Sequence, residues 1–251
     1  MIKGLYTAAT ALVALERSHD VTANNIAHAS TSGFRAQKPV QKGFYEVFAA
    51  ERANPARFDL NSAPGGGTKL IETFTDTRSG QIAKTGNPLN VALSGPGFLV
   101  VETPNGQRYL RNGAFSIDAD GELATPDGLK ILGEGGPIQA SGGPVTITAD
   151  GTINVGNENM GKLQLVEFED PHMLTREGEG LFVASDAAIG RSAPAEKTTV
   201  THEALEMSNV NLPQEMINMI LGLRAYGANQ KVITAMDETM GRLIEQVGMP
   251  A

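Results

Sequence analysis

The chain has 251 residues, of which 41% are hydrophobic and 19% are charged, and its formal net charge is −8. It contains no cysteine, which excludes disulfides, thiolate zinc sites and a cysteine nucleophile. The acidic balance argues against a nucleic-acid-binding groove, so we expect no nucleic-acid partner.

The first residues do not have the pattern of a cleavable secretory signal. In "MIKGLYTAATALVALERSHD" the charged residues Glu16 and Arg17 interrupt the apolar run before an h-region is complete. No stretch reaches the ~18 consecutive apolar residues that indicate a transmembrane helix. We therefore expect no membrane span, and a protein that is either cytoplasmic or exported by a machinery that reads no cleavable signal.

Residues 2–29 are predicted to form one amphipathic helix. Apolar or small side chains recur at alternating spacings of three and four residues, which places them in a narrow stripe on one face. Ser30, Thr31, Ser32 and Gly33 then favour a helix end, since glycine suits the left-handed position that follows one. The stripe consists of Leu5, Ala8, Leu12, Leu15, His19, Thr22, Ile26 and Ala29.

The region that follows, residues 34–67, is predicted to be an extended linker. Pro39, Pro55, Pro64 and the run Gly65–Gly67 interrupt every period, so we expect at most a short helix at 41–50.

Residues 68–207 are predicted to form an antiparallel all-β domain. The period of the apolar residues changes to two, and short β-rich runs are separated by turn residues. Five Asn-Gly or Asp-Gly pairs lie between these runs, and such pairs are strong hairpin signals because they tolerate positive φ. The pairs are Asn105-Gly106, Asn112-Gly113, Asp120-Gly121, Asp127-Gly128 and Asp150-Gly151.

A second long helix is predicted from Asn211 to the C-terminal end. Asn211 can cap it, and Pro213 suits its first turn. The three-and-four spacing returns, so each terminal helix is the most available partner of the other. The second stripe consists of Met216, Met219, Leu223, Tyr226, Gln230, Ile233, Asp237, Met240, Ile244 and Val247.

These elements predict a mixed α and β fold. The N- and C-terminal helices form a coiled-coil-like layer, and an antiparallel all-β domain is inserted between them. The expected domains are a discontinuous helical domain of 1–33 plus 208–251, the linker at 34–67, and a β-rich outer domain at 68–207.

One partner helix cannot cover all the apolar residues of the two terminal helices. Additional apolar side chains lie off the stripes, and a stripe this wide needs further cover. We infer that the pair completes its core against helices of neighbouring molecules, and the alternative is that both helices pack on the β domain of the same chain. The additional residues are Ile2, Val13, Val21, Ile217, Ile220 and Met236.

No catalytic, metal-binding or cofactor-binding constellation emerges from the sequence. His19, His28, His172 and His202 are scattered, and one histidine beside Glu169 and Asp170 is weak evidence for a metal. Ser94 and Ser192 each lack a glycine of the nucleophile elbow, and no phosphate-binding loop occurs. We expect a protein that is not an enzyme and has no cofactor.

Three segments resemble the bacterial flagellar rod and hook proteins. "ANNIAHASTSGFRAQ" at 23–37 resembles their N-terminal signature, and "SNVNLPQEMINMILGLRAYGANQKVITAMDETMGRLIEQV" at 208–247 resembles their C-terminal signature. "LNVALSGPGFLVVETPNGQRYLRNGAFSIDADGELATPDGLKILG" resembles the start of their inserted β domain. Within the family, "GEGGPI" at 133–138 and "ITADGTI" at 147–153 are most similar to the proximal rod proteins, with the distal rod proteins as the alternative. Gly227 stands where the family commonly has Glu, and a glycine in mid-helix costs about 1 kcal/mol relative to Ala.

The resemblance implies an axial structural component of the flagellar basal body. Terminal helices of many subunits would pack around a channel, and the chain would be exported through the flagellar type III apparatus into the periplasm. Its implied partners are copies of itself, other proximal and distal rod subunits and that apparatus. The expected assembly interface is Leu5, Leu12, Leu15, Ile26, Met216, Met219, Leu223, Tyr226, Ile233, Met240 and Ile244.

Two other functions compete with this one. A secreted β-rich binding module would explain the strands but would leave the terminal stripes without a role. An enzyme would need a convergent polar cluster, which the chain does not supply.

Overall fold

A computed structural model of the chain describes residues 2–43, 68–178 and 180–247. The chain divides into two compact units. The helical unit comprises Met1–Ala27, Gln37–Phe74 and Asn211–Ala251, and the β-rich unit comprises His28–Ala36 and Thr75–Val210. In the part of the chain that is described, no helix combines the length and the apolar character needed to cross a bilayer.

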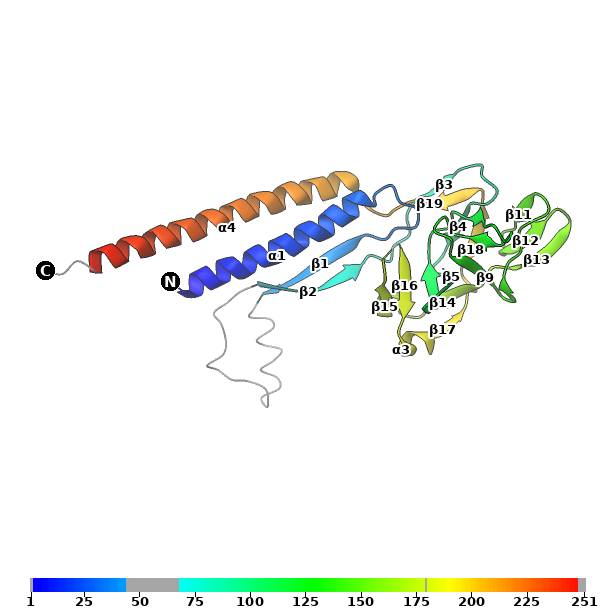
Figure 1. Cartoon of the computed structure of the whole chain (residues 1–251), viewed down its shortest axis with the longest axis horizontal. Helices are drawn as coiled ribbons and strands as arrows, with labels where there is room; N and C mark the ends of the chain where they lie inside the picture. The colour runs from blue at the N-terminus through cyan, green and yellow to red at the C-terminus, as the bar shows by residue number, and fades with distance from the viewer. Residues whose placement is uncertain (1, 44–67, 179, 248–251) are drawn as a thin grey trace. The chain divides into compact units, whose positions relative to one another are not determined.

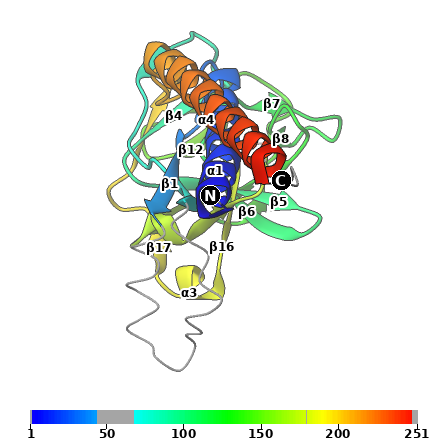
Figure 2. The ribbon, with the colours of Figure 1, turned by 90° about the vertical axis from the view of Figure 1, so that its left-hand side faces the viewer.

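The helical unit contains the two predicted terminal helices. Helix α1 spans Ile2–Ala27 and helix α4 spans Leu212–Val247. They pack against each other in opposite directions, as the positions of the two chain ends show (Figure 1). Figure 2 shows the same pair viewed from the ends of the helices. Helix α4 continues without a break through Gly227, because packing along one face offsets the low helix propensity of that glycine.

A two-stranded sheet completes the helical unit. Strands β1 (Gln37–Gly43) and β2 (Thr68–Thr75) pair with each other, and α1 packs on β1. The prediction of an extended linker at 34–67 therefore differs from the structure where residues 37–43 form a strand. The expected start of the β-rich domain at residue 68 differs too, because β2 up to Phe74 belongs with the helices. The short helix considered at 41–50 falls largely outside the described residues.

A buried asparagine joins α1 to this sheet. The side-chain amide of Asn25 donates a hydrogen bond of 2.7 Å to the carbonyl of Gln37, and its Oδ1 accepts one of 2.9 Å from the Gln37 backbone N–H. The side chain thus pairs with both backbone groups of one residue, as a neighbouring strand would. This pairing orients the C-terminal end of α1 on β1.

The β-rich unit contains one large sheet and three small ones. Neighbouring strands in these sheets pair in antiparallel directions. The ten-stranded sheet follows the order β15 (Leu174–Arg176), β16 (Leu181–Ala184), β6 (Gly106–Leu110), β5 (Phe98–Thr103), β9 (Lys130–Gly133), β8 (Leu123–Ala124) and β7 (Ser116–Ile117). Three further strands join it: β10 (Gly136–Pro137) on β9, β14 (Leu165–Phe168) on β5, and β17 (Ser192–Pro194) on β14.

The small sheets are built from the remaining strands and include the last strands before α4. Three strands form one of them, namely β11 (Val145–Ile147), β12 (Thr152–Val155) and β13 (Glu158–Lys162). Strand β18 (Thr199–His202) pairs with β4 (Val91–Ser94), and β19 (Ala204–Glu206) pairs with β3 (Ile82–Lys84). The short helices η2 (Pro171–Met173) and α3 (Asp186–Ile189) lie in connections.

Two apolar clusters fill the β-rich unit. The larger one gathers aliphatic side chains such as Leu99, Ile131 and Ile153, which are fully buried. The smaller one is aromatic, with the Tyr109 and Phe168 rings edge to face at 4.8 Å between centroids. The predicted fold class, with terminal helices and a central antiparallel β region, is confirmed.

The turn glycines confirm four of the five predicted hairpins. Gly106, Gly121, Gly128 and Gly151 have positive φ and lie between paired strands. The prediction of a hairpin at Asn112-Gly113 is wrong. A Cβ on Gly113 would stand 1.9 Å from the carbonyl oxygen of Val91, so this glycine permits close approach of two backbone segments.

Candidate functional site

Helix α1 turns part of its predicted stripe to the interior of the helical unit, and two of its most buried residues, Ala14 and Val21, lie off that stripe. Leu5, Leu12, Leu15 and Ile26 are half-buried, and Ala8 between them is buried. Small side chains such as Ala8 let a neighbouring helix approach closely. The four leucine and isoleucine residues expected at an assembly interface are therefore partly covered within the chain itself.

Helix α4 divides its predicted stripe between two faces. Met219, Tyr226, Ile233 and Met240 are half-buried, whereas other members of the stripe are exposed. Half-buried residues recur along α4 at spacings of three and four, and we call them the half-buried row. They are Glu215, Met219, Gly222, Tyr226, Asn229, Ile233, Met236 and Met240. The exposed members that were expected at the interface are Met216, Leu223 and Ile244, with 53%, 55% and 72% of their surfaces accessible.

The exposed apolar residues of α4 concentrate in its N-terminal part. Met216, Ile217, Ile220, Leu221 and Leu223, which we call the ridge, are each at least half exposed. Residues 216–223 contain no charged side chain. A helix that is apolar all round normally lies in a protein interior, and a contiguous exposed apolar patch marks an interaction surface.

The start of α4 is set by a side-chain cap, as predicted. Oδ1 of Asn211 accepts a hydrogen bond of 3.2 Å from the backbone N–H of Gln214, and Pro213 lies in the first turn. This cap begins the helix immediately before the ridge, so the local sequence determines where the ridge starts.

A hollow lies between the two helices further along α4. Its volume is about 180 Å³, and one residue of α1 and two turns of α4 line it. Its lining is largely apolar, with one carboxylate at Asp237. The lining residues are Leu5, Ile233, Thr234, Met236, Asp237 and Met240.

The exposed face of α1 adds apolar surface at its N-terminal half. Tyr6 and Val13 are 44% and 51% exposed, and their spacing of seven residues places them on one face. In the C-terminal half of α4, Val232 and Leu243 are also exposed.

The β-rich unit has a buried charge cluster that the sequence did not reveal. Glu206 on β19 forms ion pairs of 2.8 Å with Arg35 through Oε1 and with Arg111 through Oε2, and all three side chains are buried. Arg111 also donates hydrogen bonds to the carbonyls of Leu93, Gly95 and Gly97. The cluster connects three segments that are distant in sequence.

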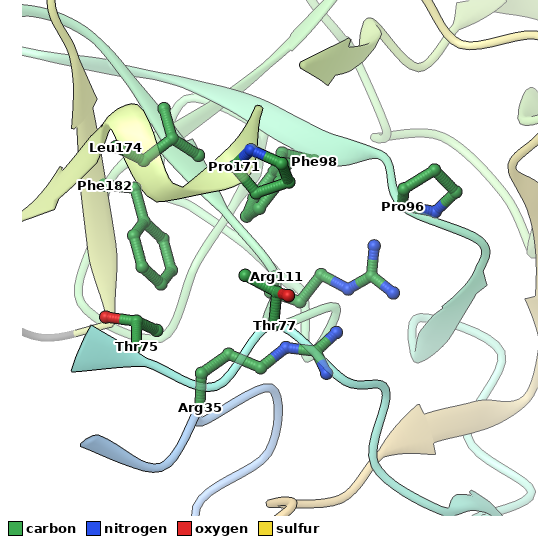
Figure 3. A pocket seen from close by; sticks show the side chains of 9 residues that line it. All are labelled: Arg35, Thr75, Thr77, Pro96, Phe98, Arg111, Pro171, Leu174 and Phe182. Atoms are coloured by element: carbon green, nitrogen blue, oxygen red, sulfur yellow. The ribbon is translucent and has the colours of Figure 1, made fainter. Parts of the chain in front are cut away.

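The electrostatics of this cluster reflect burial. Desolvation lowers the pKa of the Arg35 guanidinium, and the Glu206 carboxylate offsets part of that shift. Figure 3 shows Arg35 and Arg111 beside a cavity of about 90 Å³, with Phe98, Leu174 and Phe182 also in its lining. Both guanidinium groups pair with Glu206, which connects their segments, whereas Nη1 of Arg35 is buried and has no hydrogen-bond partner among the described residues.

The histidines and serines considered for chemistry lie in separate places. His19 is half-buried on α1, and the backbone N–H of His172 donates to Oδ1 of Asp170, which caps η2. Ser94 lies on β4 and Ser192 on β17. Among the residues that the structure describes, no three His, Asp or Glu side chains gather as a metal site would require.

Family models match three segments of the chain. The model described as "Flagella basal body rod protein" matches residues 5–35, and "Flagellar hook protein FlgE/F/G D1 domain" matches residues 92–155. "Flagellar basal body rod FlgEFG protein C-terminal" matches residues 202–246. The first and last of these segments include most of α1 and nearly all of α4.

Similar proteins extend over the whole chain. It is 35% identical to the flagellar basal-body rod protein FlgF of Salmonella typhimurium, and the alignment covers 99% of this chain and 100% of the relative. It is 32% identical to the flagellar basal-body rod protein FlgG of Buchnera aphidicola subsp. Baizongia pistaciae, over 97% of this chain and 99% of the relative. FlgF of Caulobacter vibrioides is 30% identical over 99% of both chains.

Proposed function

The chain belongs to the flagellar basal-body rod protein family, and from this premise we propose that it is a structural component of the flagellar rod that assembles through its terminal helices. The observation that carries the assembly mechanism is the ridge on α4. Five large apolar side chains at least half exposed on one uncharged stretch of helix would be costly in a protein that works alone. Packing of neighbouring subunits against these helices would remove that surface from water.

Within the rod we propose the proximal position, that of FlgF. Two relatives named FlgF are 35% and 34% identical to the chain over 99% of its length. The FlgG position is the alternative, supported by the 32% identical relative of that name. Copies of this chain and other proximal and distal rod subunits are then its partners.

The location follows from the same premise. The flagellar basal body is where proteins of this family reside, and we propose the periplasmic part of the rod. We also propose delivery through the flagellar type III export apparatus without a cleavable signal. The absence of cysteine from the sequence suits an oxidising compartment, where free thiols pair or oxidise.

We propose a structural and not a catalytic role. The buried cluster supports it, because the Glu206 carboxylate pairs with both Arg35 and Arg111, and Arg111 also donates to backbone carbonyls. The chemistry of the exposed helical surface is apolar contact, which serves assembly.

The position of a tagged copy in isolated basal bodies tests this proposal. We expect the tag at the part of the rod nearest the inner membrane, and a tag at the far end would favour the FlgG position. A chain that is absent from basal bodies, although exported and stable, would contradict the rod function itself.

A further inference from the structure

The ridge and the hollow are two complementary features of one helix pair. The ridge occupies residues 216–223 of α4 and projects large aliphatic side chains, whereas the hollow uses residues 233–240 of α4 together with Leu5 of α1. The shift between the two stretches is 17 residues (233 minus 216). At 1.5 Å per residue this is about 25 Å along the helix axis. One copy of the chain therefore cannot place its own ridge in its own hollow.

We propose that the ridge of one copy docks in the hollow of a second copy, with their α4 helices parallel and displaced by this shift. The inference rests on the proposed function, and it specifies which surfaces meet and in which direction. Each copy then inserts its ridge into the hollow of one neighbour and receives the ridge of another neighbour in its own hollow.

The hollow is large enough for an aliphatic side chain. Its volume is about 180 Å³. An apolar cavity of about 150 Å³ accommodates a benzene molecule, so a side chain such as that of Ile220 fits in the space available. The apolar lining from Leu5, Ile233 and Met240 matches the apolar character of the ridge.

The charges that flank the two features select the parallel direction. Glu215 precedes the ridge and Arg224 follows it, while Lys231 precedes the hollow and Asp237 lies within it. In the parallel arrangement Glu215 comes beside Val232, next to Lys231. Arg224 comes next to Arg242, but Asp237 and Glu238 both lie within one turn of it, so carboxylates outnumber cations around this arginine.

The antiparallel arrangement brings like charges together. When the ridge is reversed about the centre of the hollow, Arg224 lies next to Lys231. Glu215 then lies next to Arg242 but within one turn of both Asp237 and Glu238, so like charges predominate around it as well. Like-charge contacts of this kind disfavour a closed two-fold dimer. A head-to-tail contact that does not close generates an open helical filament, which is the geometry of a rod.

The experiment uses the fact that the sequence has no cysteine. In the double variant Ile217→Cys with Thr234→Cys, the shift of 17 residues places the two thiols at the same height in neighbouring copies. The two positions within one copy are about 25 Å apart along α4, which is too far for a disulfide within the chain. The full-length variant is purified, concentrated in steps, oxidised mildly and analysed on a non-reducing gel.

The expected result is a ladder of dimers, trimers and higher multimers that grows with concentration. The matched control is Ile217→Cys with Ala228→Cys, whose second thiol lies on the same helix but outside the hollow, and it should give no such ladder. A product that stops at the dimer would overturn the head-to-tail contact. A ladder no stronger than the control would overturn docking between copies, yet a tagged chain still found in basal bodies would leave the rod function standing.

Charge reversal tests the direction separately. In the same cysteine background, Arg224→Asp or Asp237→Arg alone should reduce the multimers several-fold, and the two reversals together should restore them. If the double reversal is as weak as the single ones, charge does not select the parallel arrangement and the proposed register is wrong. Circular dichroism of each variant verifies that helix content is unchanged.

Discussion

Glu206 shows how a single residue connects segments that are distant in sequence. Its carboxylate pairs with Arg35 from the segment after α1 and with Arg111 from the segment after β6. Its backbone carbonyl accepts a hydrogen bond of 2.7 Å from the N–H of Gly33, and Oε1 accepts one of 2.8 Å from the N–H of Gly80. The carboxylate is the counter-charge for two buried cations, and it therefore controls whether these segments can close together.

We predict that Glu206→Gln strongly destabilises the β-rich unit. The substitution keeps the size of the side chain but removes the carboxylate with which the buried guanidinium groups of Arg35 and Arg111 both pair. Removing one partner of a buried ion pair costs about 3–5 kcal/mol. Urea denaturation followed by a β-sheet signal measures the change in the free energy of unfolding.

The matched control for this prediction is Glu177→Gln. Glu177 pairs with Arg108, and that ion pair lowers the pKa of the Glu177 carboxylate, but the pair lies at the surface, where solvent screens it. A much smaller loss of stability is expected. Equal losses for the two variants would show that the burial of Glu206 does not matter.

At the scale of the element, α4 serves two purposes with different faces. One face carries the half-buried row that packs within the helical unit, and the opposite face of its N-terminal part carries the ridge. An apolar residue on α4 therefore contributes to folding or to assembly according to its face. Substitutions on the two faces should have separable effects.

We predict that Leu223→Asp blocks incorporation into the rod and leaves the β-rich unit folded. Leu223 is 55% exposed, so a carboxylate there remains hydrated in the free chain. Docking of a neighbour on the ridge would bury that charge without a partner, which is strongly unfavourable. Co-purification with basal bodies measures incorporation, and denaturation of the purified chain measures stability.

Two further variants complete this test. Ala228→Asp introduces the same charge at an exposed position outside the ridge and should be incorporated normally. Leu12→Asp, on the half-buried face of α1, should also block incorporation because it disturbs the helix pair. Melting of the β-rich unit by Leu223→Asp would mean that α4 belongs to the core of that unit.

At the scale of the whole molecule, the two units differ in how they are stabilised. The β-rich unit has two buried apolar clusters and the charge cluster of Glu206. The helical unit relies on one helix–helix contact and a two-stranded sheet, and much of the apolar surface of α4 stays exposed. Long helices with one packed face are marginal in water.

We predict that in a dilute solution of free chains the terminal helices exchange their amide hydrogens far faster than the β-rich unit. Residues 5–26 and 216–247 should gain protection when subunits associate, because ordering of these helices is then coupled to packing. Hydrogen exchange followed by mass spectrometry over a concentration series measures this. Strong protection of both segments at low concentration would show that the helix pair is complete in the single chain.

Much of the fold could be predicted because it depends on local patterns. Alternating spacings of three and four residues predicted both helices, and Asn211 with Pro213 predicted where α4 begins. Asp-Gly and Asn-Gly pairs predicted four hairpins correctly, since positive φ is a property of the glycine itself. At Asn112-Gly113 the same pattern failed, because there the glycine accommodates a distant strand.

The candidate site could be predicted only in part. The sequence correctly identified which helices carry exposed apolar residues, but it grouped the ridge residues Met216 and Leu223 with the inward-facing Met219 and Tyr226. The N-terminal part of α4 is apolar on all sides, so the spacing alone does not show which face turns inward. In the sequence, the only sign of the pairing between Asn25 and Gln37 is an asparagine inside a predicted helix. Asparagine is unfavourable there, because its side chain competes for the hydrogen bonds of the helix backbone.

The sequence by itself determined the two amphipathic helices, the antiparallel β region between them, most of the turns and the absence of thiol chemistry. These features depend on residues close together in the chain, or on composition. Only the tertiary structure decided which face of α4 is covered, where the hollow lies and how Glu206 joins two arginines from distant segments. Each of these depends on contacts between residues far apart in the sequence, and burial is defined by such contacts.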